Sequence, residues 1–198
     1  MIGLLVPRIK GPAAGAAGWF AVLASLSLMG CQHAYQEMPV AGAPKRPILR
    51  TDSTVYVALP PDGRRKRDFV PASGETAAIL IRDAFAKYVK RAYMGRRVQS
   101  FADGLETARA NQWNYFVYPS ILRWEDHATD LSGLRDKIEV KIEIADTVSG
   151  EILHATVLRG RSRWFSGGED TPKDLLPDPV RNYVSSLFQP VRVPSAFR

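Results

Sequence analysis

Three consecutive residues near the middle of the chain carry side chains that could do acid–base or metal chemistry. Glu125, Asp126 and His127 supply two carboxylates and an imidazole, the groups that general bases and metal sites use. Consecutive residues on an extended segment point to opposite faces, so these groups would not converge on one ion or substrate. The pattern favours a hydrogen-bonded strand end after Trp124, and a hydrolase or ligand-binding site using this region is the alternative.

The remaining motifs give no catalytic or metal-binding arrangement. His33 and His154 lie in segments of different kinds, so the sequence has no helical histidine pair with zinc-ligand spacing. No glycine-rich phosphate loop precedes a Lys-Ser or Lys-Thr pair, and the Ser-Gly pairs lack the spacing of a nucleophile elbow. We therefore assign no catalytic residue, metal or cofactor, and we predict a protein that is not an enzyme.

The only cysteine lies behind a basic segment and an Ala- and Leu-rich stretch, in the order Leu28, Met29, Gly30, Cys31. This ending resembles a lipobox, in which the thiol takes a diacylglyceryl group and cleavage after Gly30 frees an α-amine for a third acyl chain. Each buried methylene contributes about 0.8 kcal/mol, so several chains anchor a protein stably. The apolar stretch is shorter than the roughly 20 residues that a transmembrane helix needs. An uncleaved signal anchor or a misassigned start is the alternative.

The same N-terminal pattern predicts the cellular location of the protein and the net charge of its mature chain. Asp after the cysteine favours retention in the inner membrane of Gram-negative bacteria, and this chain has Gln32, so we expect the periplasmic face of the outer membrane. Removing residues 1–30 takes away two cations, and the net charge falls from +7 to about +5. That balance lacks the concentrated basic face of a nucleic-acid binder. A nucleic-acid module would require the signal interpretation to be wrong.

Four successive cations form the densest charge cluster of the sequence: Arg64, Arg65, Lys66 and Arg67. Such a run is usually a solvated loop. The functional alternative is contact with anionic headgroups or lipopolysaccharide phosphates, because each cation near a charged membrane contributes about 1 kcal/mol.

The elements that would position these residues follow from periodicity and turn chemistry. Residues 1–30 are the signal, 31–52 the lipidated N-terminus with a flexible Pro/Ala/Gly tether, 53–190 a globular domain and 191–198 a tail. Strands are predicted at 54–59, 97–100, 115–124, 137–144 and 151–164, with an edge or bulge at Pro119. Helices are predicted at 73–91, capped by Ser73, at 103–111 and at 173–188. The expected fold is an α/β (α+β) two-layer sandwich, a mixed sheet of about five strands with helices on one face.

The central and later motifs resemble a family of bacterial lipoproteins, domain of unknown function 4823, over residues 52–190. The likeness rests on the segments 118–127, 132–133, 136–137, 162–164 and 174–177. His127 stands where the family usually has Arg, and Leu131 where an aromatic is commoner. The hairpin at 146–153 is similar, at the level of fold, to amino-terminal TolB-like and curli-secretion lipoprotein domains. The resemblance implies a small α/β lipoprotein domain and no activity.

Together these patterns predict a non-enzymatic lipoprotein held on the membrane by its N-terminal acyl chains. Its domain would bind or scaffold an unidentified envelope protein, with Trp124, Glu125, Asp126 and His127 as a partner-binding or loop motif. A periplasmic hydrolase or ligand-binding enzyme is the second hypothesis, and the oligomeric state stays open.

Overall fold

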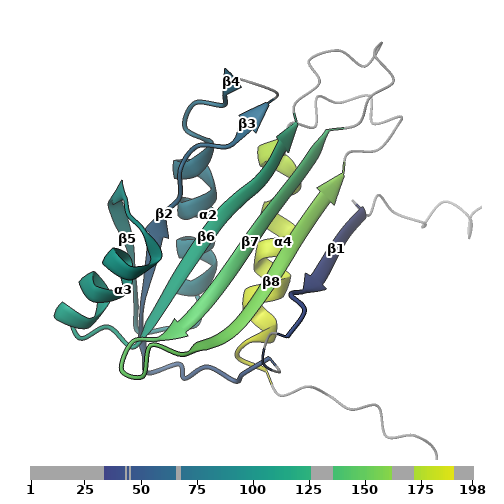
Figure 1. The fold of residues 1–198 in the computed structure, drawn as a ribbon. Helices are drawn as coiled ribbons and strands as arrows, with labels where there is room; N and C mark the ends of the chain where they lie inside the picture. The colour runs from purple at the N-terminus through teal and green to yellow at the C-terminus, as the bar shows by residue number, and fades with distance from the viewer. Residues whose placement is uncertain are drawn as a thin grey trace, which may run out of the picture. The chain divides into compact units, whose positions relative to one another are not determined.

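A computed structural model describes residues 34–42, 44, 46–65, 68–125, 136–161 and 172–189, which belong to one compact unit. Its main sheet has six strands in the order β1-β8-β7-β6-β2-β5 (Figure 1). These strands are β1 (Ala34–Pro39), β2 (Thr54–Leu59), β5 (Arg91–Val98), β6 (Tyr115–Glu125), β7 (Lys137–Asp146) and β8 (Ile152–Arg161). A separate two-stranded sheet joins β3 (Arg64–Arg65) to β4 (Asp68–Phe69). The helices are α2 (Ser73–Ala86), α3 (Phe101–Ala110), the 3-10 helix η3 (Pro172–Leu175) and α4 (Pro177–Ser186).

Strand β7 lies at the centre of an antiparallel β6-β7-β8 meander. Its burial alternates residue by residue, as its sequence predicts, with Ile138, Val140, Ile142 and Ile144 almost completely buried. Since side chains of a strand alternate between faces, the aliphatic residues all meet the core. The predicted half-buried antiparallel strand and its hairpin partner β8 are confirmed.

Helices α2 and α4 cover the aliphatic face of the sheet (Figure 1). Ile81 and Phe85 of α2 and Val180 and Val184 of α4 are fully buried in the same cluster as Ile142. Burying such side chains contributes about 1.5–3 kcal/mol each, so this layer supplies most of the packing energy. The predicted two-layer α/β arrangement is confirmed here.

Helix α3 differs, because it packs on the opposite face of the sheet. Leu105 and Ala108 of α3 form a second cluster with Tyr56 of β2 and Phe116 of β6. Strand β2 is buried on both faces, and its apolar run without alternation is typical of a strand covered on two sides. The prediction that all helices lie on one face is therefore corrected for α3.

The predicted tether also differs from the structure. Strand β1 pairs antiparallel with β8, from Ala34 opposite Arg161 to Pro39 opposite Thr156. Farther along, Leu49 is buried and its N–H donates to the Leu187 carbonyl at 2.7 Å. Backbone pairing with a free strand edge needs no apolar periodicity, so the sequence pattern cannot reveal it. The sheet gains a sixth strand, and much of 31–52 is bound to the domain.

Several boundaries shift for identifiable reasons. Strand β5 begins at Arg91, so α2 ends earlier than predicted. The last helix is interrupted into η3 and α4, with Pro177 as the first residue of α4, where proline's missing N–H costs nothing. Pro119 lies in β6, an interior strand, opposite Ile142 of β7, and the register shift of β6 falls between Ile121 and Arg123, so the expected edge strand or bulge at Pro119 is not observed. The pairing of β6 with β2 ends at Val117, so Pro119 has a ladder partner on the β7 side alone.

Candidate functional site

Four candidate site residues that the structure describes, Arg64, Arg65, Trp124 and Glu125, lie at one end of the sheet, which we call the entry end. There β1 begins, β6 and β8 end and β7 begins (Figure 1). The strand register places Ala34 opposite Arg161, Arg161 opposite Lys137, and Lys137 opposite Glu125. These four residues form one row across four strands.

Trp124 and Glu125 have different environments at this end. Trp124 is only 4% exposed, lies opposite Ile138 and belongs to the main core cluster. Gly63, just before β3, lies so close that an added Cβ would come within 2.9 Å of the Trp124 Cβ. Trp124 is thus a packing residue that joins the β3 segment to β6.

Glu125 faces the opposite side of β6, where basic side chains surround it. Its carboxylate lies 3.7 Å from the Lys137 Nζ and 3.8 Å from a guanidinium nitrogen of Arg123. Such half-exposed pairs contribute about 0.2–1 kcal/mol each. Asp126 and His127 lie outside the described residues. The described half of the motif is therefore engaged in packing and ion pairing.

The first two cations of the basic run form a strand and not only a loop. Arg64 pairs with Phe69 and Arg65 with Asp68, and the Val70 N–H donates to the Gly63 carbonyl at 2.9 Å. The Arg64 guanidinium carbon stacks 4.5 Å from the centre of the Phe69 ring, which is 58% exposed. Lys66 and Arg67 lie outside the described residues. The hairpin presents a cation and an aromatic ring side by side to solvent.

A ladder of charged residues covers the face of β6, β7 and β8 opposite α2 and α4. Glu139 lies between two guanidinium groups, 3.8 Å from Arg123 and 3.3 Å from Arg159. Lys141 pairs with Glu143 at 2.8 Å. No helix among the described residues covers this part of the sheet, which we call the open face. The alternating charges predicted for β7 lie on it.

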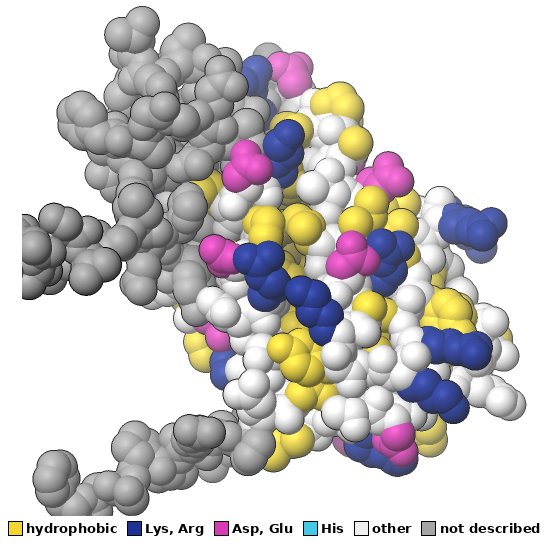
Figure 2. All heavy atoms as spheres, turned by 180° about the vertical axis from the view of Figure 1, so that it is seen from behind, with side chains coloured by type: hydrophobic (Ala, Val, Ile, Leu, Met, Phe, Trp, Pro, Cys, Tyr) yellow, Lys and Arg dark blue, Asp and Glu magenta, His cyan; other side chains and the backbone are white. Residues whose placement is uncertain are grey.

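The helical face carries a different surface. Figure 2, seen from behind, shows acidic and basic side chains interspersed over it. The exposed charged residues of its two helices include Glu75, Asp83, Lys87, Asp178 and Arg181. Neither sign dominates, so this face offers no single-sign patch.

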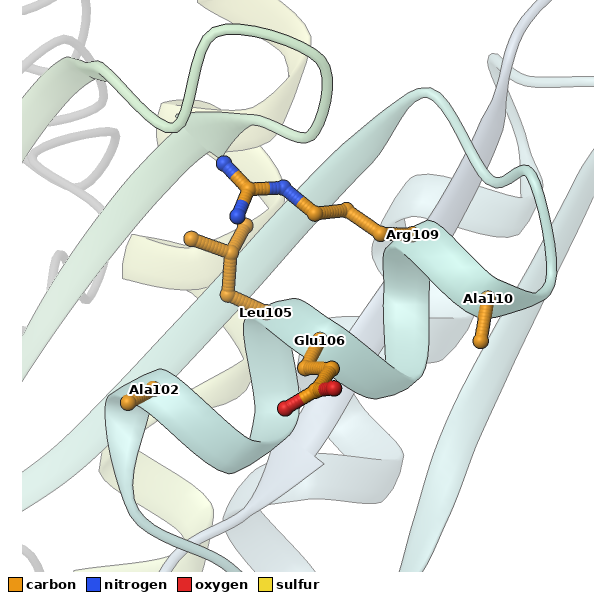
Figure 3. Close-up of a pocket in the computed structure, with 5 residues that line it drawn as sticks. All are labelled: Ala102, Leu105, Glu106, Arg109 and Ala110. Carbon is orange, nitrogen blue, oxygen red and sulfur yellow. The ribbon is translucent and has the colours of Figure 1, made fainter.

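A hollow of about 640 Å³ lies beside α3 and is lined by Ala102, Leu105, Glu106, Arg109 and Ala110 (Figure 3). The Arg109 side chain extends past Leu105, and its Nε donates to the Thr147 carbonyl at 2.6 Å. Glu106 points away from Arg109. The two charged groups do not converge on a common point, and Arg109 is occupied in holding the β7–β8 turn.

A buried polar cluster, absent from the sequence predictions, joins β1, β8 and α4. The His154 Nδ1 lies 3.2 Å from the Pro44 carbonyl oxygen, and its ring stacks on Tyr183 at 5.9 Å between centroids. Burial, reinforced by the nearby Glu37 carboxylate, raises the pKa of Tyr183 well above its usual value. Arg46 forms an ion pair with Glu37 and lies over the Tyr183 ring. These residues are far apart in sequence, so no local pattern indicates their contact.

Within the described ranges, no group of three or more His, Cys, Asp or Glu side chains is arranged to hold a metal ion. No helix in the same ranges combines the length and the hydropathy that a membrane span requires.

The fold defines the chain as a mixed α/β domain, two-layered for most of its sheet, with one helix on the second face. A family model described as Domain of unknown function (DUF4823) matches residues 48–187. The chain belongs to this family, as its central motifs predict. No curated protein matches the sequence.

The chain is similar to solved structures at low sequence identity. PelC from Paraburkholderia phytofirmans, solved as a dodecamer, is 14% identical with a TM-score of 0.60, and the match covers 80% of this chain and 99% of PelC. Lipoprotein GNA1162 from Neisseria meningitidis is 12% identical with a TM-score of 0.46, covering 68% of this chain and 99% of that one. At these identities the PelC match supports the architecture alone.

Proposed function

We propose that this protein is a lipoprotein anchored by Cys31 on the periplasmic face of the outer membrane, and that its α/β domain binds or scaffolds an envelope protein without catalysing a reaction. The anchor is supported by the sequence Leu28-Met29-Gly30-Cys31 behind a basic and then apolar segment. In the mature protein, cleavage after Gly30 leaves Cys31 as the acylated first residue.

The open face of the sheet is the observation that supports binding. Its charged side chains are partly exposed, with exposed fractions of 18% for Glu139 and 34% for Arg159. Ion pairs of this kind are weak, so their side chains can form new pairs with charges on a binding protein. Complementary charges between two surfaces speed their association and make it specific.

The environment of Glu125 is relevant to the alternative function, an enzyme that uses Glu125, Asp126 and His127. Its carboxylate is held between Lys137 and Arg123 at the strand end. This pairing supports a structural role for Glu125, so the binding function is preferred.

The anchor is tested by the intact mass of the protein extracted from membranes of a Gram-negative host. We expect a chain that begins at Cys31 and carries three acyl groups. The matched control is Cys31→Ser, which should keep the signal and gain no lipid. An unmodified full-length mass in the soluble fraction would refute the anchor and with it the envelope location.

The binding face is tested by cross-linking in intact cells followed by purification. A charge exchange on the open face, Glu139→Lys with Lys141→Glu, should abolish cross-links to the partner while conserving net charge. The matched control is Asp83→Lys with Lys87→Glu, two exposed residues in and just after helix α2, which should leave the cross-links intact. Equal cross-linking by both variants would rule out the open face as the binding surface.

A further inference from the structure

The β3–β4 hairpin lies at the entry end of the sheet, next to the end of β6 and separated from β1 by β7 and β8 (Figure 1). Gly63, which leads into β3, packs against Ile121 and Trp124 near the end of β6, where an added Cβ would meet side-chain atoms at 2.8 and 2.9 Å. The register then connects β6 through β7 and β8 to Ala34. The hairpin and the point where the chain enters the domain are thus at the same end of a rigid sheet.

The distance from the anchor to this end is short. Cys31 precedes Ala34 by three residues, and a fully extended chain of that length spans at most about 11 Å. Because β1 is paired with β8 along its whole length, the segment after Ala34 cannot act as a spacer. An acyl group on Cys31 would therefore keep the entry end close to the bilayer surface. This step rests on the anchor proposed above.

The chemistry of the hairpin suits that position. Arg64 and Phe69 are both exposed, and the guanidinium stacks on the ring. Arginine binds phosphate groups through its fork of N–H donors, and an aromatic ring is favourable at the boundary between headgroups and acyl chains. The β7–β8 turn at the opposite end of the sheet carries the carboxylates of Asp146 and Glu151 beside the Arg109 guanidinium, and Asp146 accepts hydrogen bonds from the N–H groups of Val148 and Ser149.

We propose that the β3–β4 hairpin contacts anionic phospholipid headgroups of the membrane that holds Cys31, with Arg64 binding phosphate and Phe69 at the interface. The entry end then faces the bilayer. The β7–β8 turn points away from it, and the open face stands upright, accessible to a partner. The hairpin adds a second, charge-dependent contact to the acyl anchor and sets the orientation of the domain.

The orientation is tested with the full acylated protein added to vesicles of phosphatidylethanolamine and phosphatidylglycerol. The chain has one cysteine, Cys31, and acylation blocks it, so a single new thiol can be labelled with a fluorophore. Pro71→Cys, at an exposed residue just after the hairpin, reports on the hairpin and leaves Arg64 and Phe69 in place. Val148→Cys, at a side chain that is 89% exposed on the β7–β8 turn, is the matched control. We expect an aqueous quencher to act several-fold more weakly on the label at 71. Headgroup-labelled quenching lipids should act on that label alone.

The charge requirement is tested in the same assay. Arg64→Glu combined with Pro71→Cys, or vesicles of phosphatidylcholine alone, should return the label at 71 to the accessibility of the label at 148. Persistent shielding in both cases would overturn headgroup binding. Equal accessibility of both labels in acylated protein would overturn the orientation and leave the anchor intact. A missing acyl mass would instead refute the proposed anchor, and circular dichroism of each variant would separate misfolding from loss of contact.

Discussion

The carboxylate of Asp62 caps helix α2 from outside the helix, accepting a hydrogen bond from the Gly74 N–H at 2.8 Å. Its other oxygen accepts from the Ala72 N–H at 3.2 Å. Ser73, the predicted cap, is used elsewhere, because its hydroxyl donates to the Val70 carbonyl and accepts from the Gly63 N–H. Asp62 thus satisfies N–H groups at the start of α2 and fixes the helix to the turn after β2.

Replacing Asp62 with Ala should therefore lower the free energy of unfolding by about 1–2 kcal/mol, the usual cost of losing a cap. Urea denaturation would measure it. The control is Asp83→Ala, an exposed carboxylate of the same helix that pairs with its neighbour Arg82, and it should change stability by less than about 0.5 kcal/mol. Equal losses in the two variants would contradict the capping role.

Trp124 and Glu125 are neighbours in sequence, and their substitutions should have very different effects on the free energy of unfolding. Trp124→Ala removes a side chain that is 4% exposed and should cost about 3–5 kcal/mol. Glu125→Gln loses half-exposed ion pairs and should cost less than about 1 kcal/mol. Thermal and urea unfolding of both variants would test this contrast. A large loss for Glu125→Gln would mean that its pairs matter more than their exposure implies.

Gly104 lets α3 approach the sheet closely. A Cβ at this position would lie 2.5 Å from the Phe116 ring, which is fully buried and cannot move freely. Gly104→Ala should therefore lower stability by about 1–3 kcal/mol, despite alanine's better helix propensity. The control Glu106→Ala, on the exposed side of α3, should be close to neutral in the same denaturation experiment. A more stable Gly104→Ala protein would show that α3 can shift away from β6.

The buried Tyr183 predicts a pH dependence. Burial raises its pKa in the folded state, so above the ordinary pKa of 10.0 the unfolded chain loses this proton while the folded chain keeps it. The free energy of unfolding must then fall as the pH rises beyond that value. Tyr183→Phe should match the native protein near pH 7 and lose less stability by pH 11. Identical curves for the two proteins between pH 9 and 11 would contradict this assignment.

Local patterns predicted much of this fold, because alternation and helical spacing depend only on nearby residues. The charges and aliphatic residues of β7 lie on the faces that its sequence indicates. Trp124 and Glu125 were correctly located at a strand end. The hairpin within the basic run was not predicted, since Arg64 and Phe69 meet only through a turn.

By itself, the sequence determined the family, the order of most strands and helices, and the motif around Cys31 on which the proposed anchor rests. Only the tertiary structure decided that β1 joins the sheet, that α3 lies on the second face, and that His154 meets Pro44 across 110 residues of chain. Periodicity records which side of an element is buried but not which distant segment buries it. Pairing at a strand edge uses backbone N–H and C=O groups, which do not depend on the side chain. No side-chain pattern therefore indicates it.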